Sequence, residues 1–155
     1  MHGRGRYCAG ATAAALLVAG ATTFPPADRP DDRAASVGRW RVVAVTMNGR
    51  ELDPDLTAML SSAYAADGTW RLFFRSLVVA EGVSSNHPDT VPASFEMRTL
   101  GHPPDDGRAY WGIYEMTADR RRLCFAAADQ PRPTEFSAPR ASGRTLVEFE
   151  RIHAR

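Results

Sequence analysis

The chain of 155 residues is long enough for one domain, and no internal repeat is visible in it. Its apolar content of 44% and charged content of 24% are ordinary for a globular protein, which excludes a chain that is disordered throughout. The formal net charge of +1 gives no electrostatic reason to expect a nucleic-acid partner or an acidic membrane surface.

Residues 1–21 have the pattern of a secretory signal peptide. Arg4 and Arg6 precede a short apolar run, Ala9–Val18, and residues 19–21 form an Ala-x-Ala cleavage site. The apolar run is shorter than the ~20 residues that span a bilayer, so no stable membrane span is predicted. We therefore expect an exported protein that is periplasmic or extracellular after cleavage.

Residues 22–37 combine prolines and charges without periodicity, as in Pro25-Pro26, and this composition predicts a disordered linker. The folded domain is accordingly predicted to span residues 38–153. Cleavage of the signal peptide would leave Cys124 as the only cysteine, which excludes an intramolecular disulfide. A lone cysteine in an apolar strand is typically a small buried hydrophobe, and a reactive thiol is the alternative.

The domain opens with a predicted strand, Gly38–Met47. Its alternating residue types place Trp40, Val42 and Ala44 on one face. Asn48-Gly49, a tight-turn dipeptide, ends the strand.

A short helix is predicted next, over residues 53–60. Asp53 is a suitable N-cap and Pro54 suits the first helical position. Leu56, Met59 and Leu60 would share one face, which could cover the barrel end or the apolar side of the first strand.

Asp67-Gly68 lies between two β-prone runs, Ala63–Ala66 and Thr69–Arg75, which predicts a hairpin. Polar residues 84–89 are predicted to form a loop. The remaining predicted strands are Leu77–Val83, Ala93–Thr99, Ala109–Met116, Arg121–Ala126 and Arg144–Ile152. About eight short strands with tight turns predict an all-β fold, a small antiparallel β-barrel with one short helix after the first strand.

Five motifs follow one another between Gly38 and Arg151: Gly38-x-Trp40-x-Val42-Val43, Asn48-Gly49, Gly112-Ile113-Tyr114, Leu123-Cys124-Phe125 and Arg132-Pro133-x-x-Phe136. Together they resemble an uncharacterised lipocalin-like family of small exported bacterial proteins that is abundant in planctomycetes. The resemblance implies a lipocalin-like β-barrel and an extracytoplasmic location. It implies no activity, substrate or catalytic residues.

No residue spacing predicts an enzyme. The histidines of the domain, His87, His102 and His153, are not spaced as zinc ligands, and no nucleophile or phosphate-binding motif is present. We therefore predict no catalytic residues, no metal and no cofactor. The run Arg120–Arg122 is interpreted as a solvated turn, with a weak anion-binding patch as the alternative.

Seven aromatic residues are predicted to point into the barrel: Trp40, Trp70, Phe74, Phe95, Trp111, Tyr114 and Phe149. They could form a packed core, or they could line a cavity for a small hydrophobic ligand, because an eight-stranded barrel is just wide enough for either. Arg132 and Glu135 are predicted to pair across Pro133 and to hold the following loop in place.

Two functions remain open at this point. The first is a non-enzymatic exported protein that binds a small apolar ligand inside the barrel. The second is an extracytoplasmic interaction or inhibitor module whose loops contact an envelope protein.

Overall fold

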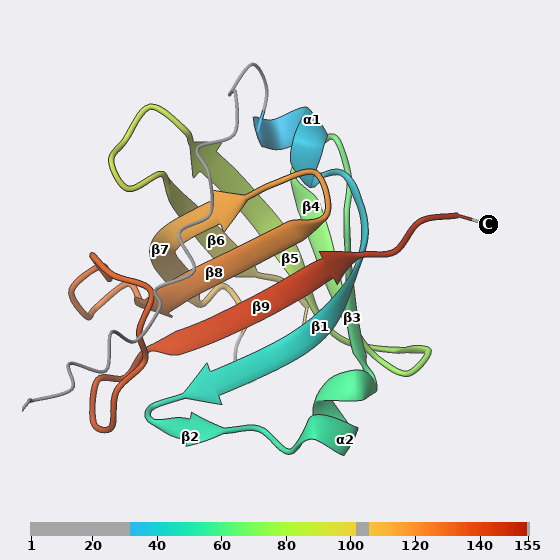
Figure 1. Cartoon of the computed structure of the whole chain (residues 1–155). Coiled ribbons are helices and arrows are strands. Elements are labelled where there is room, and N and C mark those ends of the chain that lie inside the picture. The colour runs from blue at the N-terminus through green and yellow to red at the C-terminus, as the bar shows by residue number, and fades with distance from the viewer. Residues whose placement is uncertain (1–31, 102–105, 155) are drawn as a thin grey trace, which may run out of the picture.

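An antiparallel sheet closed on itself forms the body of the protein (Figure 1). The computed structural model describes residues 32–101 and 106–154. Its elements are α1 (Asp32–Ser36), β1 (Gly38–Met47), β2 (Arg50–Glu51), α2 (Pro54–Ala58), β3 (Leu60–Tyr64), β4 (Thr69–Phe74), β5 (Leu77–His87), β6 (Ser94–Thr99), β7 (Ala109–Met116), β8 (Arg120–Ala127) and β9 (Thr145–Arg151). The predicted signal peptide lies outside the described residues.

The nine strands have the order β2-β1-β3-β4-β5-β6-β7-β8-β9, and a further pairing between β1 and β9 closes the sheet. Strand β2 pairs only with the last two residues of β1, so the other eight strands make up the barrel. The predicted all-β barrel with a short helix after its first strand is thereby confirmed. Within the part of the chain that the structure describes, no helix is long and apolar enough to cross a membrane.

Strand β1 changes its inward face half-way along. Its register with β9 shifts between Val42 and Ala44. This irregularity turns Ala44 to solvent and brings Val45 into the core. The prediction that Ala44 shares the face of Trp40 is therefore wrong, because a bulge adds one residue to the alternation.

The turn after β1 forms as predicted, and the predicted helix forms but ends earlier, at Ala58, because Leu60 already belongs to β3. Asn48 and Gly49 both have positive φ angles, 51° and 81°, as a tight hairpin turn requires. The Asp53 side chain accepts hydrogen bonds from the first backbone N–H groups of α2. Leu56, however, is 45% exposed and Thr57 is the buried residue of the helix. The prediction that Leu56 faces the barrel is wrong.

Strand β5 is longer than predicted. Ser84–His87, expected in a loop, pairs with Ser94–Met97 of β6. Two serines and an asparagine have low strand propensity, but backbone pairing with β6 overrides that preference.

Helix α1 lies across one end of the barrel, at the top in Figure 1. The Trp40 indole N–H donates to the carbonyl of Ser36 over 2.9 Å, and the Tyr114 hydroxyl donates to the Asp32 carboxylate over 2.6 Å. The Arg151 guanidinium stacks on the Trp40 ring at 4.1 Å and donates to the Val37 carbonyl. This end is called the α1 end below, and the opposite one, at the bottom of the view, the α2 end.

Helix α1 occupies the last part of the predicted linker, 22–37, so the linker prediction is wrong for these residues. Residues 22–31 lie outside the described part. Hydrogen bonds from Trp40, Tyr114 and Arg151 attach this segment to the barrel. Since the attachment does not depend on an apolar face, no apolar periodicity marks α1 in the sequence.

Candidate functional site

Six of the seven aromatic residues predicted to point inward do so. Residues that pair directly across neighbouring strands lie on the same face of a sheet. The register therefore defines an inward set that contains the buried core, and it includes Trp40, Trp70, Phe74, Phe95, Tyr114 and Phe149.

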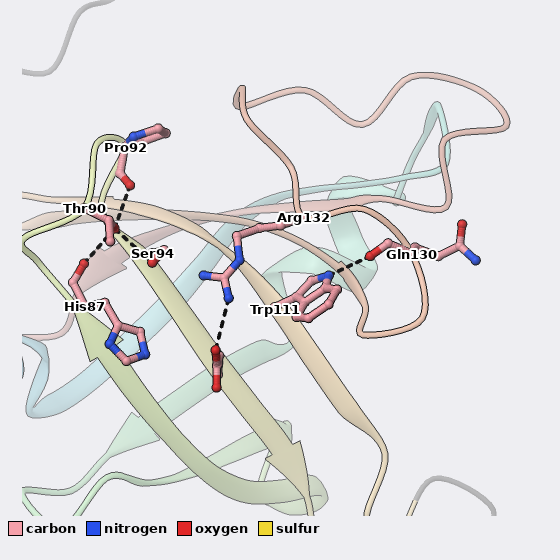
Figure 2. A network of polar contacts seen from close by, with 8 residues as sticks. His87, Thr90, Pro92, Ser94, Trp111, Gln130 and Arg132 are labelled. Carbon is pink, nitrogen blue, oxygen red and sulfur yellow. Dashed lines mark hydrogen bonds and ion pairs between the residues drawn. The ribbon is translucent and has the colours of Figure 1, made fainter.

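Trp111 lies on the outer face of the barrel, so its predicted place in the lining is wrong. It alternates along β7 with the inward residues Gly112 and Tyr110, and it pairs with Glu96. Its indole N–H donates to the carbonyl of Gln130 over 2.7 Å, as Figure 2 shows. An aromatic residue of a strand can point outward when a loop covers the outer face of the sheet. The composition of the sequence does not show where such a loop packs.

The inward side chains of β6, β7 and β8 fill their half of the barrel. The Phe95 ring meets Tyr114 and Phe125 edge to face, with centroids 6.5 Å and 6.3 Å away. Between them, a Cβ atom on Gly112 would lie 2.3 Å from the Cys124 carbonyl oxygen. The surroundings of Phe95 and Gly112 are therefore tightly packed, while Met97 and Tyr110 of the same inward face are half-buried.

The inward side chains of β4 and β5 are less enclosed. Leu72, Phe74 and Ala80 follow the register of the inward face, yet they are only half-buried and do not belong to the core cluster. An inward residue of a closed barrel keeps solvent contact only where open space reaches it. Leu72 and Phe74 lie toward the α2 end, so solvent contacts these inward side chains from that end of the barrel.

Deeper along the same two strand pairs lie polar atoms without partners. Ser62 Oγ and Trp70 Nε1 are buried, and neither has a hydrogen-bond partner among the described residues. Ser62 pairs with Trp40 and with Leu72, which places it on the inward face. Most buried polar groups in folded proteins are hydrogen-bonded, so a pair of exceptions in one interior marks a place to which a partner can bind.

Arg121 is the third such residue. Within the predicted solvated turn, its neighbours Arg120 and Arg122 do point outward and pair with Glu150 and Glu115. Arg121 itself is only 4% exposed and pairs across the strands with Phe149. The prediction of a solvated turn is wrong for Arg121, because β8 begins at Arg120 and side chains of a strand alternate between its faces.

The Arg121 guanidinium lies between aromatic rings. Its carbon Cζ is 3.9 Å from the centroid of the Tyr64 ring and 5.9 Å from that of Phe149. Its Nε and Nη1 atoms have no hydrogen-bond partner among the described residues. Ser62, Trp70 and Arg121 are called the polar cluster below.

The aromatic rings do not replace those missing hydrogen bonds. A cation–π contact contributes about 0.5–2 kcal/mol. Each buried donor that stays unpaired costs about 1–3 kcal/mol, and more when it is charged. An arginine cannot release its proton to relieve this cost. The polar cluster is therefore suited to accept a group with negatively charged oxygens, or water.

A small pocket of about 150 Å³ lies on the α1 side of Tyr64. Ser36 of α1 and Gly68 of the β3–β4 turn form its rim, with Ser84 and Asn86 of β5. Because Tyr64 also carries the Arg121 guanidinium on its ring, this one residue separates the pocket from the polar cluster.

The loop between β8 and β9, residues 128–144 and called the covering loop below, packs on the outside of the barrel. Pro133 is fully buried, and the Phe136 ring lies 4.0 Å from the Arg122 guanidinium. Arg132 pairs with Glu96 over 3.1 Å, and Glu135 pairs with Arg144. The predicted pair between Arg132 and Glu135 is wrong, because Arg132 pairs with Glu96 of β6 and Glu135 pairs with Arg144 within the loop.

Beside the covering loop, an outer groove of about 430 Å³ runs over β5, β6 and β7. Ser85, Glu96, Arg98 and Trp111 are among its lining residues, and each occupies an outward position of the register. Figure 2 shows Arg132 near Trp111, which lines the groove. The groove is an open feature of the surface.

The described ranges hold few groupings of the residue types that ligate metals. No group of three His, Cys, Asp or Glu residues there could hold a metal ion. His153 pairs with Asp119 at the exposed surface, and His102 lies outside the described residues.

No protein-family model matches the chain, and no curated protein matches it. The features of the barrel that bear on function are the polar cluster and the half-buried inward residues of β4 and β5. The barrel is compatible with ligand binding of the lipocalin type.

Proposed function

We propose that this protein is a non-enzymatic binding protein that holds a small, largely apolar ligand inside its barrel, on the side of β3, β4 and β5. The observation that carries this proposal is the unequal filling of the interior. Phe95, Tyr114 and Leu123 are fully buried on one side, whereas Leu72 and Phe74 retain solvent contact on the other.

The residues of the open half suit an apolar ligand. Leu72, Phe74 and Ala80 offer apolar surface, and burying such surface favours binding by about 25 cal/mol per Å². Ligand pockets are usually apolar with a few well-placed polar groups, and the polar cluster supplies such groups at the deep end.

The signal-peptide pattern of residues 1–21 and the resemblance to exported lipocalin-like proteins support action outside the cytoplasm. We propose a periplasmic or extracellular carrier on this basis. Fractionation of cells that express the full chain, with mass determination of the mature amino terminus, tests the location.

Titration of the purified protein with dodecanol and dodecanoic acid, followed by tryptophan emission, tests the binding. Trp70 lines the proposed space and Trp111 lies outside the barrel. A saturable change is expected in the wild type and in Trp111→Phe, and it should disappear in Trp70→Phe.

A blocking variant separates binding in the interior from binding at the surface. Ala80→Phe would fill the open half, whereas Val83→Phe on the same strand points outward and serves as the matched control. Binding should be lost only in Ala80→Phe. Equal binding by both variants, or no saturable change with either compound in the wild type, would overturn the proposal.

The outer groove favours a second candidate, a protein-interaction module. Trp111 and Arg132, which lie beside one another there, are residue types enriched at protein interfaces. A stoichiometric partner recovered from envelope extract by the wild type, and lost with Trp111→Ala, would favour this function over ligand transport.

A further inference from the structure

We infer that the ligand of the barrel carries an acidic group, such as a carboxylate, which binds at Arg121 with the apolar part running along β4 toward the α2 end. This inference rests on the proposed function and adds the chemical class of the ligand. It is carried by the burial of Arg121 together with its two unpartnered nitrogens.

The position of Arg121 sets the depth of the acidic group. Along β4, Trp70 lies level with Tyr64, whose ring stacks on the Arg121 guanidinium. The apolar residues Leu72 and Phe74 follow toward the α2 end. Since a strand rises about 3.3 Å per residue, Trp70 and Phe74 lie about 13 Å apart, which suits an elongated molecule with one polar end.

The charges around Arg121 are segregated by the sheet. The acids nearest to it in the register, Glu148 and Glu150 of β9, belong to the outward face and pair with Arg122 and Arg120 positions there. Among the described residues, no ion pair involves Arg121. A neutral ligand would leave this guanidinium unpaired, whereas a carboxylate would pair with it directly.

Ser62 and Trp70 complete the recognition of such a group. The Ser62 hydroxyl and the Trp70 indole N–H are both unpartnered and can each donate to an oxygen; Ser62 lies on the same strand as Tyr64, and Trp70 pairs with Tyr64 from β4. A carboxylate only accepts hydrogen bonds, and the side chains of Arg121 and Trp70 only donate them. The polar cluster thus discriminates against a ligand that presents a cation.

The test compares dansyl-undecanoic acid with its methyl ester in the wild-type chain by dansyl emission. The acid should bind about tenfold to a hundredfold more tightly than the ester, as expected for one buried hydrogen-bonded charge pair. Arg121→Met should reduce acid binding to the level of the ester and leave the ester unchanged. Arg120→Met, an outward neighbour on the same strand, should bind both as the wild type does.

The outcomes separate this inference from the proposed function. Equal binding of acid and ester, with no effect of Arg121→Met, would overturn the acidic group but leave the apolar binding site intact. No binding of either probe would overturn both. Stabilisation of the wild type by acetate or phosphate alone, without dodecanoate binding, would indicate an anion site and overturn the elongated ligand.

A stability measurement excludes a purely structural role for Arg121. Replacing an unpaired buried charge by a similar apolar side chain is often neutral or stabilising, so ligand-free Arg121→Met should unfold at or above the wild-type temperature. A markedly lower unfolding temperature would show that Arg121 supports the fold instead, and would overturn its assignment to a ligand.

Discussion

Gly112 lies where three strands of the packed half come closest together. A Cβ atom there would lie 2.3 Å from the Cys124 carbonyl oxygen and 2.7 Å from the Phe95 ring. We expect Gly112→Ala to lower the free energy of unfolding by at least about 1–3 kcal/mol, measured by urea denaturation, since inserted volume forces backbone shifts. Phe95→Leu should not rescue it, because the carbonyl contact persists. A variant as stable as the wild type would contradict this packing.

Cys124 should be inert in the folded protein. Its side chain is fully buried under the covering loop, and its Sγ lies 3.4 Å from the Ser137 carbonyl oxygen. Burial raises the pKa of the Cys124 thiol above its usual value of 9.0. We expect no reaction of Cys124 with a disulfide reagent at neutral pH until the chain is unfolded, when its thiol should react.

The same thiol gives a pH dependence with a defined sign. The folded chain holds the Cys124 proton more tightly than the unfolded chain does, because the folded pKa is raised. This contribution to stability is full below the usual pKa of 9.0 and is lost as the pH rises through the folded pKa. Cys124→Ala should therefore lose less stability than the wild type between neutral and strongly alkaline pH.

Strand alternation alone could predict the inward position of the six aromatic residues, whereas the burial of Cys124 on the outer face depends on the covering loop. Arg121 lies in the predicted strand Arg121–Ala126, but a run of three arginines is typical of a solvated turn, and that composition was given more weight than the alternation with Leu123. Its burial depends on the pairing of β8 with β9 and on the Tyr64 ring, which are contacts distant in the sequence.

At the scale of elements, the covering loop is held by apolar burial more than by ion pairs. Pro133 is fully buried, whereas the Arg132–Glu96 pair is largely exposed. We expect Arg132→Ala to cost about 0–1 kcal/mol in urea denaturation, as exposed pairs do. Pro133→Ala removes two buried methylene groups and should cost about 1.6 kcal/mol. A larger loss from Arg132→Ala would contradict this order.

Helix α1 should loosen when one hydroxyl is removed. Tyr114→Phe deletes the hydrogen bond to the Asp32 carboxylate. We expect a loss of about 1.5–3 kcal/mol in stability, as for a hydrogen bond to a charged group. The Trp40 indole N–H, bonded to Ser36, should exchange with solvent faster when followed by NMR. Unchanged exchange would mean that α1 is held by its other contacts.

The strand Ala109–Met116, an almost continuous run of β-forming residues, was predicted with correct bounds. Helix α1 and the last four residues of β5 were missed, and for related reasons. Both carry polar residues, and both are set by partners distant in the sequence: Tyr114 and Arg151 for α1, and Ser94–Met97 for β5. Local patterns do not contain such contacts.

At the scale of the whole molecule, the number of strands and their up-and-down order followed from the turns, and closure followed from the need to pair sheet edges. The difference in burial between the two sides of the interior did not follow from the sequence. Leu72 and Phe95 look alike in sequence, and only the bend of the sheet brings aromatic rings together on one side. The location of a ligand site is therefore a property of the closed barrel and not of any one motif.

The seam between β1 and β9 has a mechanical consequence. The chain enters β1 and leaves β9 at the same end, where Arg151 bonds to Val37. A force that pulls these two chain ends apart would load the hydrogen bonds of the seam one after another, as in a zipper, and not all together in shear. The barrel should open at low force by peeling from the α1 end, so β1 and its contacts to α1 would be lost before the packed half yields.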